Sequence, residues 1–150
     1  MESSEIFKKR FLELADDLEC KKSEVPKRLN IDYAIYSKII SFGIIPRPMI
    51  LVRIADCFNV SVDYLLGYID TPDFYRSETR RTFYEVYSQL KEEKNYNDYA
   101  IARKLHVSTS YTTNWKKKNF TPSLPNLIIL SQTFGVSLDY ILGRTDDKNH

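Results

Sequence analysis

One thirteen-residue pattern occurs twice in this chain. FNVSVDYLLGYID occupies residues 58–70 and FGVSLDYILGRTD occupies residues 134–146, an offset of 76 residues. Self-similarity of this kind indicates repeated units, each folded in the same way. The same offset, carried backwards without a gap, pairs Phe7 with Phe83, Leu14 with Leu90, Val25 with Ile101, Leu29 with Leu105, Ile31 with Val107, Pro46 with Pro122 and Leu51 with Leu127. The sequence therefore predicts two copies of one small domain.

The repeat also predicts the domain limits. Residues 71–79, TPDFYRSET, lie between the end of one copy and the start of the next and contain Pro72, so we expect them to form a linker. The first domain then covers residues 1–70 and the second residues 80–150. With 43% hydrophobic and 28% charged residues, the composition is that of a globular protein with a real core.

Each copy is expected to contain five short helices, which makes the fold class all-α. Phe7, Phe11 and Leu14 recur at helical spacing in the first helix of the first copy. A second helix is expected to carry Val25 and Leu29. In the second copy, the corresponding apolar residues are Phe83, Tyr87 and Leu90 in the first helix and Ile101 and Leu105 in the second.

The junction after the second helix predicts a helix-turn-helix. Asn30 in the first copy and His106 in the second are residue types that tolerate a left-handed backbone. Asp32 and Ser108 follow two residues later, and Asp and Ser are favoured N-caps. We therefore expect a tight turn into a third helix.

The last two helices of each copy carry matching signals. One face of the fourth helix is apolar, and the fifth is expected to begin at Ser61 or Ser137 as N-cap, to place Asp63 or Asp139 at the positive end of its dipole, and to end at a glycine. The residues on that apolar face are Leu51, Ile54, Ala55 and Phe58 in the first copy and Leu127, Leu130, Ser131 and Phe134 in the second.

The second copy contains the segment ARKLHVSTSYTTNWKKKNFTP followed by FGVSLDYILG. This pattern resembles the Cro and lambda-repressor-like Xre family of helix-turn-helix domains, and the resemblance covers both copies. It implies two tandem five-helix lambda-repressor-like domains and a sequence-specific transcriptional regulator, more specifically a repressor. Double-stranded DNA is the implied partner, and no cofactor is implied. Likeness of fold carries function by analogy alone.

In this family the third helix lies in the major groove. Val107, Thr112 and Trp115 of the second copy fall on the inward stripe, which leaves the other side to DNA. The lysine run that follows departs from the family's usual Glu and Gly near positions 116 and 118, and it is also explained by a solvated helix end. The expected DNA-binding residues are Ser108, Thr109, Ser110, Thr113, Asn114, Lys116, Lys117 and Lys118.

The first copy differs at the same positions. Its outward residues Tyr33, Ala34, Ser37 and Lys38 form a second candidate DNA site, although the Asp32 carboxylate disfavours a phosphate at the helix start. The apolar residues nearby suggest instead a surface for a homodimer or a protein partner, unless they fill the core. The candidate interface residues are Tyr36, Ile40, Phe42, Ile44 and Ile45. A protein-interaction or antirepressor-like module is therefore the alternative function.

Other function classes have little support. Cys20 and Cys57 lack metal-ligand spacing and are expected to be reduced, and the only histidines are His106 and His150. We therefore expect no metal site, no catalytic residues and no enzyme activity. The chain has no apolar run of about 20 residues and begins without a signal peptide, so we expect no membrane contact and a cytoplasmic location. Charge is uneven: residues 1–75 carry −2 and residues 76–150 carry +4, which makes the second half the better partner for a polyanion.

Overall fold

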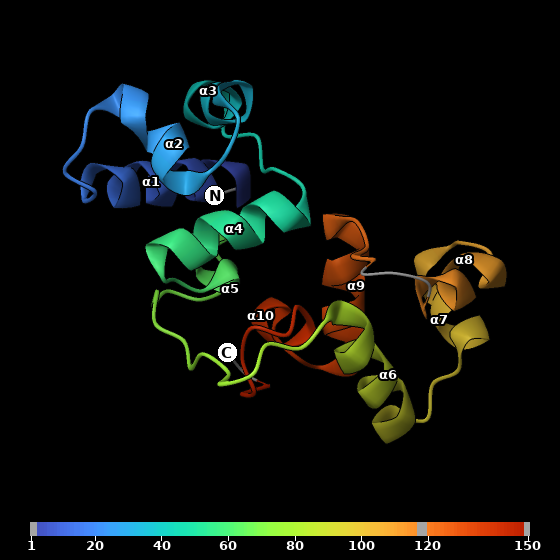
Figure 1. Ribbon diagram of the computed structural model, residues 1–150. Helices are drawn as coiled ribbons and strands as arrows, with labels where there is room; N and C mark the ends of the chain where they lie inside the picture. Colours follow the sequence, from blue (N-terminus) through green and yellow to red (C-terminus); the bar gives the residue numbers. More distant parts are fainter. Residues whose placement is uncertain (1–2, 117–119, 149–150) are drawn as a thin grey trace. The chain divides into compact units, whose positions relative to one another are not determined.

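The computed structural model describes residues 3–116 and 120–148, and this part of the chain is helical (Figure 1). The chain divides into two compact units, Met1–Phe74 and Tyr75–His150. Within the described residues, β-type pairing is limited to an isolated antiparallel bridge between Arg76 and Thr145.

Within residues 3–74, the first unit forms five α-helices and one short 3-10 helix. Phe7, Phe11 and Ile54 have no exposed surface and form the centre of its core, as the apolar stripes predicted. The phenyl ring of Phe11 packs edge-on against that of Phe58, with centroids 5.9 Å apart. The helices are α1 (Ser3–Asp16), η1 (Lys22–Glu24), α2 (Val25–Leu29), α3 (Tyr33–Phe42), α4 (Pro48–Phe58) and α5 (Val62–Leu65).

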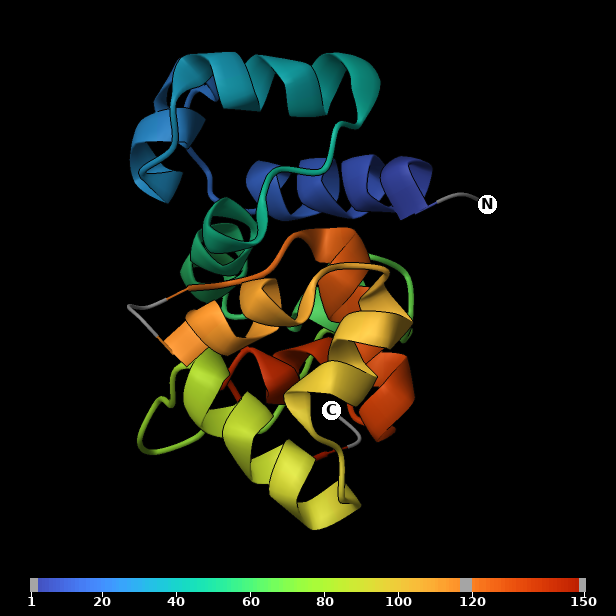
Figure 2. The same cartoon turned by 90° about the vertical axis from the view of Figure 1, so that its right-hand side faces the viewer.

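The described residues of the second unit also form five α-helices and one short 3-10 helix. Figure 2 shows these helices in a view turned by 90° from that of Figure 1. Its core is built around Trp115, which is 1% exposed and whose ring lies 5.0 Å from that of Tyr87. The last three α-helices of this unit begin 76 residues after those of the first unit. The elements are α6 (Phe83–Lys94), α7 (Asp98–Leu105), α8 (Thr109–Thr113), η2 (Asn114–Lys116), α9 (Leu124–Phe134) and α10 (Leu138–Ile141).

The local signals that end and begin helices hold in both units. Asn30 and His106 have φ values of 54° and 57°, which confirms the left-handed turns. Ser61 and Ser137 accept hydrogen bonds from the backbone N–H groups of Tyr64 and Tyr140, which confirms them as N-caps. These contacts define where the short helices start, because helices of four or five residues have little stability of their own.

The boundary between the units lies inside the segment expected to be a linker. The carbonyl oxygen of Pro72 accepts a hydrogen bond from the N–H of Ser61, 2.9 Å away, within the first unit. On the other side, the N–H of Ser77 donates to the carbonyl oxygen of Arg144 at 3.0 Å, within the second unit. Both parts of this segment are thus hydrogen-bonded to the unit they adjoin.

A buried ion pair supports the last helix of the second unit. The guanidinium of Arg144 bonds the carboxylate of Asp139, and both side chains are fully buried. The sequence suggested only a dipole role for Asp139, because a pattern of single residues does not show which cation folds back onto it. A buried carboxylate needs such a partner, since an unpaired buried charge is strongly destabilising.

The two left-handed glycines of the second unit provide a matched test. A Cβ on Gly143, where φ is +75°, would lie 1.9 Å from the carbonyl oxygen of Arg81, whereas a Cβ on Gly135, at φ +68°, meets no atom within 4 Å. Gly135→Ala should lower the free energy of unfolding by about 1–2 kcal/mol through backbone strain alone. Gly143→Ala should lower the free energy of unfolding by about 1–3 kcal/mol more than Gly135→Ala does, because the backbone at Arg81 must move. Urea unfolding followed by Trp115 fluorescence measures this unit, and equal losses in the two variants would contradict the steric account.

Candidate nucleic-acid interface

In the helix-turn-helix of the second unit, a side-chain N-cap fixes the start of each helix. Asn97 caps α7 by accepting from the N–H of Ala100 at 2.8 Å, and Ser108 caps α8 by accepting from the N–H of Tyr111 at 3.3 Å. Between the helices, the N–H of Val107 donates to the carbonyl oxygen of Ala102 at 3.0 Å. The short turn at His106 therefore has a defined geometry rather than depending on packing alone.

Two side chains attach α8 and the turn after it to the core. Thr112 is 1% exposed, and its hydroxyl donates to the carbonyl oxygens of Asp98 at 3.2 Å and Thr109 at 2.9 Å. Trp115 stacks on Phe120 with ring centroids 5.8 Å apart. The inward stripe predicted for this helix is therefore confirmed at Thr112 and Trp115, while Val107 is half-buried. A buried threonine is compatible with this position because its hydroxyl has backbone partners.

The start of α7 is fixed against α6 by a polar group of three residues. The hydroxyl of Tyr87 donates to the carboxylate of Asp98 at 2.9 Å, and the ammonium of Lys91 lies 2.7 Å from the same oxygen. Burial, followed by the hydrogen bond to Asp98, raises the pKa of the Tyr87 phenol, so it remains a donor. This group was not anticipated from the sequence, since its members belong to two different helices.

The opposite side of α8 presents hydroxyl and amide groups to solvent. Ser108, Ser110, Thr113, Asn114 and Lys116 are exposed, whereas Thr109 is half-buried. The predicted single helix is in fact divided, because the α-helix ends at Thr113 and a 3-10 turn begins at Asn114. Lys117 and Lys118, also expected to bind DNA, lie outside the described residues.

The exposed polar side chains differ in the hydrogen bonds that they already make. The hydroxyl of Ser108 is occupied by the cap and lies 3.1 Å from that of Ser110, and the hydroxyl of Thr113 donates to the carbonyl oxygen of Ser110 at 3.1 Å. The side-chain amide of Asn114 has no hydrogen-bond partner among the described residues. Asn114 is therefore the group on this face best able to form two new hydrogen bonds.

The corresponding face of the first unit is chemically different. Tyr33 is 67% exposed, Ala34 and Lys38 are also exposed, and Ser37 is half-buried. Asp32 stands at the N-cap of α3, but within the described residues its carboxylate makes no cap hydrogen bond. The face therefore combines an aromatic ring and one cation with a carboxylate at the helix start.

Tyr36 is not a surface residue, contrary to its placement in the candidate interface. It is 5% exposed, and its ring packs 6.1 Å from that of Phe11 in the core. The reason is helical spacing, since Tyr36 and the fully buried Ile39 lie three residues apart on the inner side of α3. Burial raises the pKa of the Tyr36 phenol.

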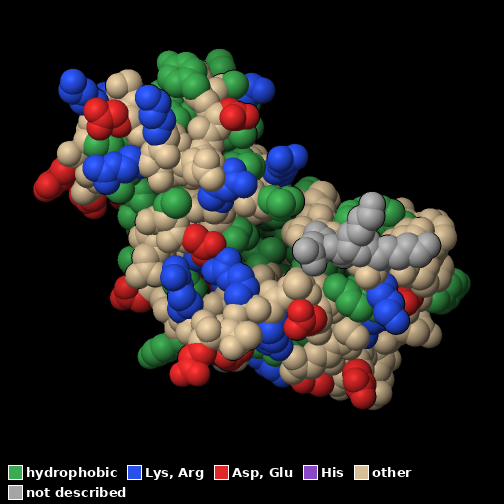
Figure 3. All heavy atoms as spheres, viewed as in Figure 1, with side chains coloured by type: hydrophobic (Ala, Val, Ile, Leu, Met, Phe, Trp, Pro, Cys, Tyr) green, Lys and Arg blue, Asp and Glu red, His purple; other side chains and the backbone are tan. Residues whose placement is uncertain are grey.

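The rest of the apolar set reaches the surface to different degrees. Phe42 is 76% exposed and Ile44 is 48% exposed, whereas Ile40 and Ile45 are half-buried. Figure 3 shows hydrophobic side chains at the surface over α3, with lysine and arginine side chains nearby. Exposed apolar side chains that lie near one another, as Phe42 and Ile44 do along the chain, can form part of an interaction surface.

Neither a metal centre nor a membrane span is found among the residues that the structure describes. These residues include no group of three or more His, Cys, Asp or Glu side chains placed to hold a metal ion. None of the helices in residues 3–116 and 120–148 is long and apolar enough to cross a bilayer.

Comparison with known proteins identifies the helix-turn-helix of the second unit. Residues 88–141 match a family model described as "Helix-turn-helix". A Bacillus subtilis (strain 168) protein named "Uncharacterized HTH-type transcriptional regulator YobD" is 34% identical over 61 residues, which is 41% of this chain and 54% of that protein. No solved structure matches. The second unit therefore contains a helix-turn-helix domain, and the chain aligns with about half the length of this relative.

The cap of α8 can be tested against a serine that stands at an N-cap without capping. Ser123 precedes α9, but its hydroxyl makes no cap hydrogen bond within the described chain. Ser108→Ala should lower the free energy of unfolding by about 1 kcal/mol, because it removes a bonded cap. Ser123→Ala should change it by less than about 0.5 kcal/mol. Trp115 fluorescence during urea unfolding measures both, and a larger loss for Ser123→Ala would show that the hydroxyl of Ser108 does not hold the helix start.

Proposed function

We propose that this protein is a sequence-specific regulator of transcription, acting as a repressor, which binds double-stranded DNA through α8 of the second unit. One observation carries the proposal: exposed Ser110, Thr113 and Asn114 lie opposite the buried anchors Thr112 and Trp115, inside the segment that matches the helix-turn-helix model. In such domains the second helix of the motif enters the major groove. The relative's printed name, an HTH-type transcriptional regulator, supports the regulatory role.

The side chains of this face suit base readout of moderate selectivity. The Asn114 amide can bond adenine in bidentate fashion, and the hydroxyls of Thr109, Ser110 and Thr113 are less selective. Ser108 and the first backbone N–H groups of the motif's second helix offer a phosphate contact. No cofactor is needed for such recognition.

The distribution of charge along the chain also supports the second unit as the one that binds DNA. Residues 76–150 carry a net +4, and Lys116, Lys117 and Lys118 follow the recognition face directly in the sequence. Lysines at this position are expected to contact phosphates, which contributes affinity without sequence preference.

The first unit is proposed to be a second, diverged copy of the same domain. The 76-residue offset that relates the sequence motifs also relates the starts of α3 and α8, α4 and α9, and α5 and α10. Its third helix offers Tyr33, Ala34, Ser37 and Lys38 to a second DNA half-site. The Asp32 carboxylate opposes a phosphate there, so this unit contributes less to DNA affinity than the second.

Selection from a random pool of duplex DNA tests the proposal. The purified protein should enrich one motif over several rounds at physiological salt, and Asn114→Ala should relax the preference at one base pair by about 1–3 kcal/mol. Replacing Lys116, Lys117 and Lys118 by Ala should weaken binding to all sequences and make the log–log salt slope shallower by about 0.9 for each phosphate that is no longer neutralised.

Lys94→Ala is the matched control for the lysine variants, because Lys94 is an exposed lysine at the end of α6, outside the proposed interface. It should leave the salt slope unchanged. A folded protein that enriches no motif would overturn the proposal.

A second candidate function is supported by the exposure of Phe42 and Ile44 in the first unit. A homodimer or an antirepressor-like complex with another protein would cover these side chains, together with the half-buried Ile40 and Ile45. Phe42→Lys should then abolish association measured as molecular mass by light scattering. Leu12→Lys, at a 37% exposed apolar residue of α1, is the control and should leave association intact. A mass that is monomeric in the wild type excludes the homodimer.

A further inference from the structure

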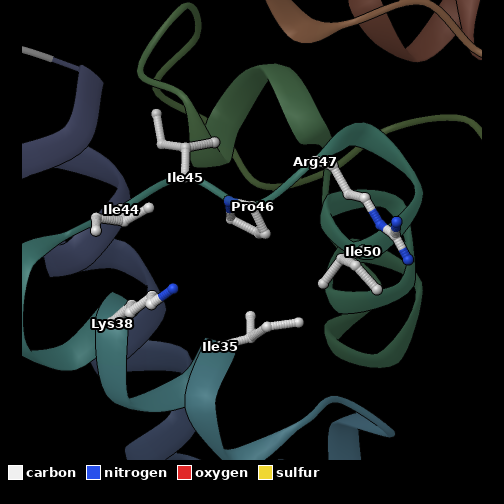
Figure 4. Close-up of a pocket in the computed structure, with 7 residues that line it drawn as sticks. All are labelled: Ile35, Lys38, Ile44, Ile45, Pro46, Arg47 and Ile50. Atoms are coloured by element: carbon white, nitrogen blue, oxygen red, sulfur yellow. The ribbon is translucent and has the colours of Figure 1, made fainter.

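A cavity of about 320 Å³ opens in the first unit between α3, the segment that follows it and the start of α4 (Figure 4). This volume lies at the lower end of the range of about 300–1,000 Å³ that is usual for small-molecule sites. Tyr33 and Phe42 do not line it, so it is distinct from the most exposed part of the apolar surface. Its lining residues are Ile35, Lys38, Ile44, Ile45, Pro46, Arg47 and Ile50.

The cavity has an apolar wall on each side. In Figure 4 the side chain of Ile35, from α3, extends towards that of Ile50, from α4, and Pro46 lies above the space between them. Ile50 is 4% exposed and Ile35 is half-buried, so these side chains are held by the core rather than free in solvent. The apolar part of a ligand in this cavity would therefore contact the side chains of Ile35 and Ile50.

The second unit shows why the space is open. At the positions related by the 76-residue offset to Ile35 and Ile44, it has Tyr111 and Phe120, whose rings meet edge-on with centroids 5.9 Å apart. Both rings also contact Trp115, which occupies the position of Ile39. Isoleucine is shorter than an aromatic residue, so replacing these rings by isoleucines leaves space between the same elements.

Two cations stand at the rim of this apolar space. Figure 4 shows Lys38 and Arg47 on opposite sides of the cavity, one on α3 and the other at the N-cap of α4. Both residues are exposed, and among the residues that the structure describes, neither side chain has an acidic partner or a hydrogen bond. In Figure 4 the ammonium of Lys38 is directed towards the space, so an anionic group on a ligand would pair with Lys38, and Arg47 adds a second positive charge at the rim.

We propose that this cavity is a binding site for a small apolar carboxylate, whose hydrocarbon part lies against Ile35, Ile45 and Ile50 and whose carboxylate pairs with Lys38. The site goes beyond the proposed function, because binding requires neither DNA nor a second protein chain.

Sodium octanoate, used below its micelle concentration, is the probe. Titrated into the full chain carrying ¹³C-labelled isoleucine methyl groups, it should shift the methyl resonances of Ile35, Ile45 and Ile50 in a saturable manner. Octanol, which lacks the charge, should bind at least threefold more weakly, and acetate, which lacks the hydrocarbon, should give no saturable shift. Equal affinities for octanol and octanoate, or shifts spread evenly over the isoleucines, would overturn the proposal.

Variants test the two parts of the site separately. Lys38→Ala should weaken octanoate binding by about twofold to fivefold, the range for exposed ion pairs, and Arg47→Ala should weaken it less, because Arg47 contributes only its charge at the rim. Lys27→Ala is the matched control, since Lys27 is exposed but does not line the cavity, and it should leave the affinity unchanged. If all three variants bind alike, the carboxylate is not recognised and the proposal fails.

The double variant Ile35→Tyr and Ile44→Phe transfers the second unit's aromatic residues and should close the cavity. Octanoate binding should then be lost while the circular dichroism spectrum and melting temperature remain close to those of the wild type. Because the charge variants do not alter the core, they decide the question if this double variant folds poorly. A rise in molecular mass that competes with octanoate would show that a second copy occupies the cavity, and would overturn the small-molecule assignment.

Discussion

The packing of Trp115 and Thr112 beneath α8 is the interaction on which the proposed DNA-binding face depends. The helix has only five residues, and isolated helices shorter than about 12–15 residues are marginal in water. Its conformation therefore comes from outside: from the ring contacts of Trp115 with Tyr87 and Phe120, from the two carbonyl partners of the Thr112 hydroxyl, and from the Ser108 cap. Because the inner side of this segment packs on the core, the hydroxyl and amide groups on its outer side are held in a fixed arrangement.

The two units have helices in corresponding order but carry different surfaces. Both contain a left-handed residue before the third helix and both cap the last helix with a serine. The aromatic cluster of Tyr111, Trp115 and Phe120 fills the space beside the third helix in the second unit, whereas isoleucines leave a cavity in the first. Polar readout is therefore proposed for one unit, and apolar recognition for the other.

Sequence reasoning was most accurate where the physical cause is local. The left-handed turns at Asn30 and His106 and the caps at Ser61 and Ser137 depend on residues within a few positions of each other, so a pattern can show them. The apolar stripes correctly placed most of the core for the same reason. Tyr36 was misplaced because helical spacing puts it on one face of α3 with Ile39 but does not say that this face turns inward; the contact with Phe11, on another helix, decides that.

By itself, the sequence determined the repeated motif, the helical class and the turn and cap positions, and it predicted which residues of the third helix would contact DNA. These follow from spacing along the chain. The tertiary structure alone decided the pairing of Asp139 with Arg144, the polar group of Tyr87, Lys91 and Asp98, the division of the recognition segment at Asn114 and the cavity between Ile35 and Ile50. The physical reason is that each of these depends on distances between side chains of different elements, or on how closely such side chains fill the space, and neither quantity is encoded in the spacing of one segment.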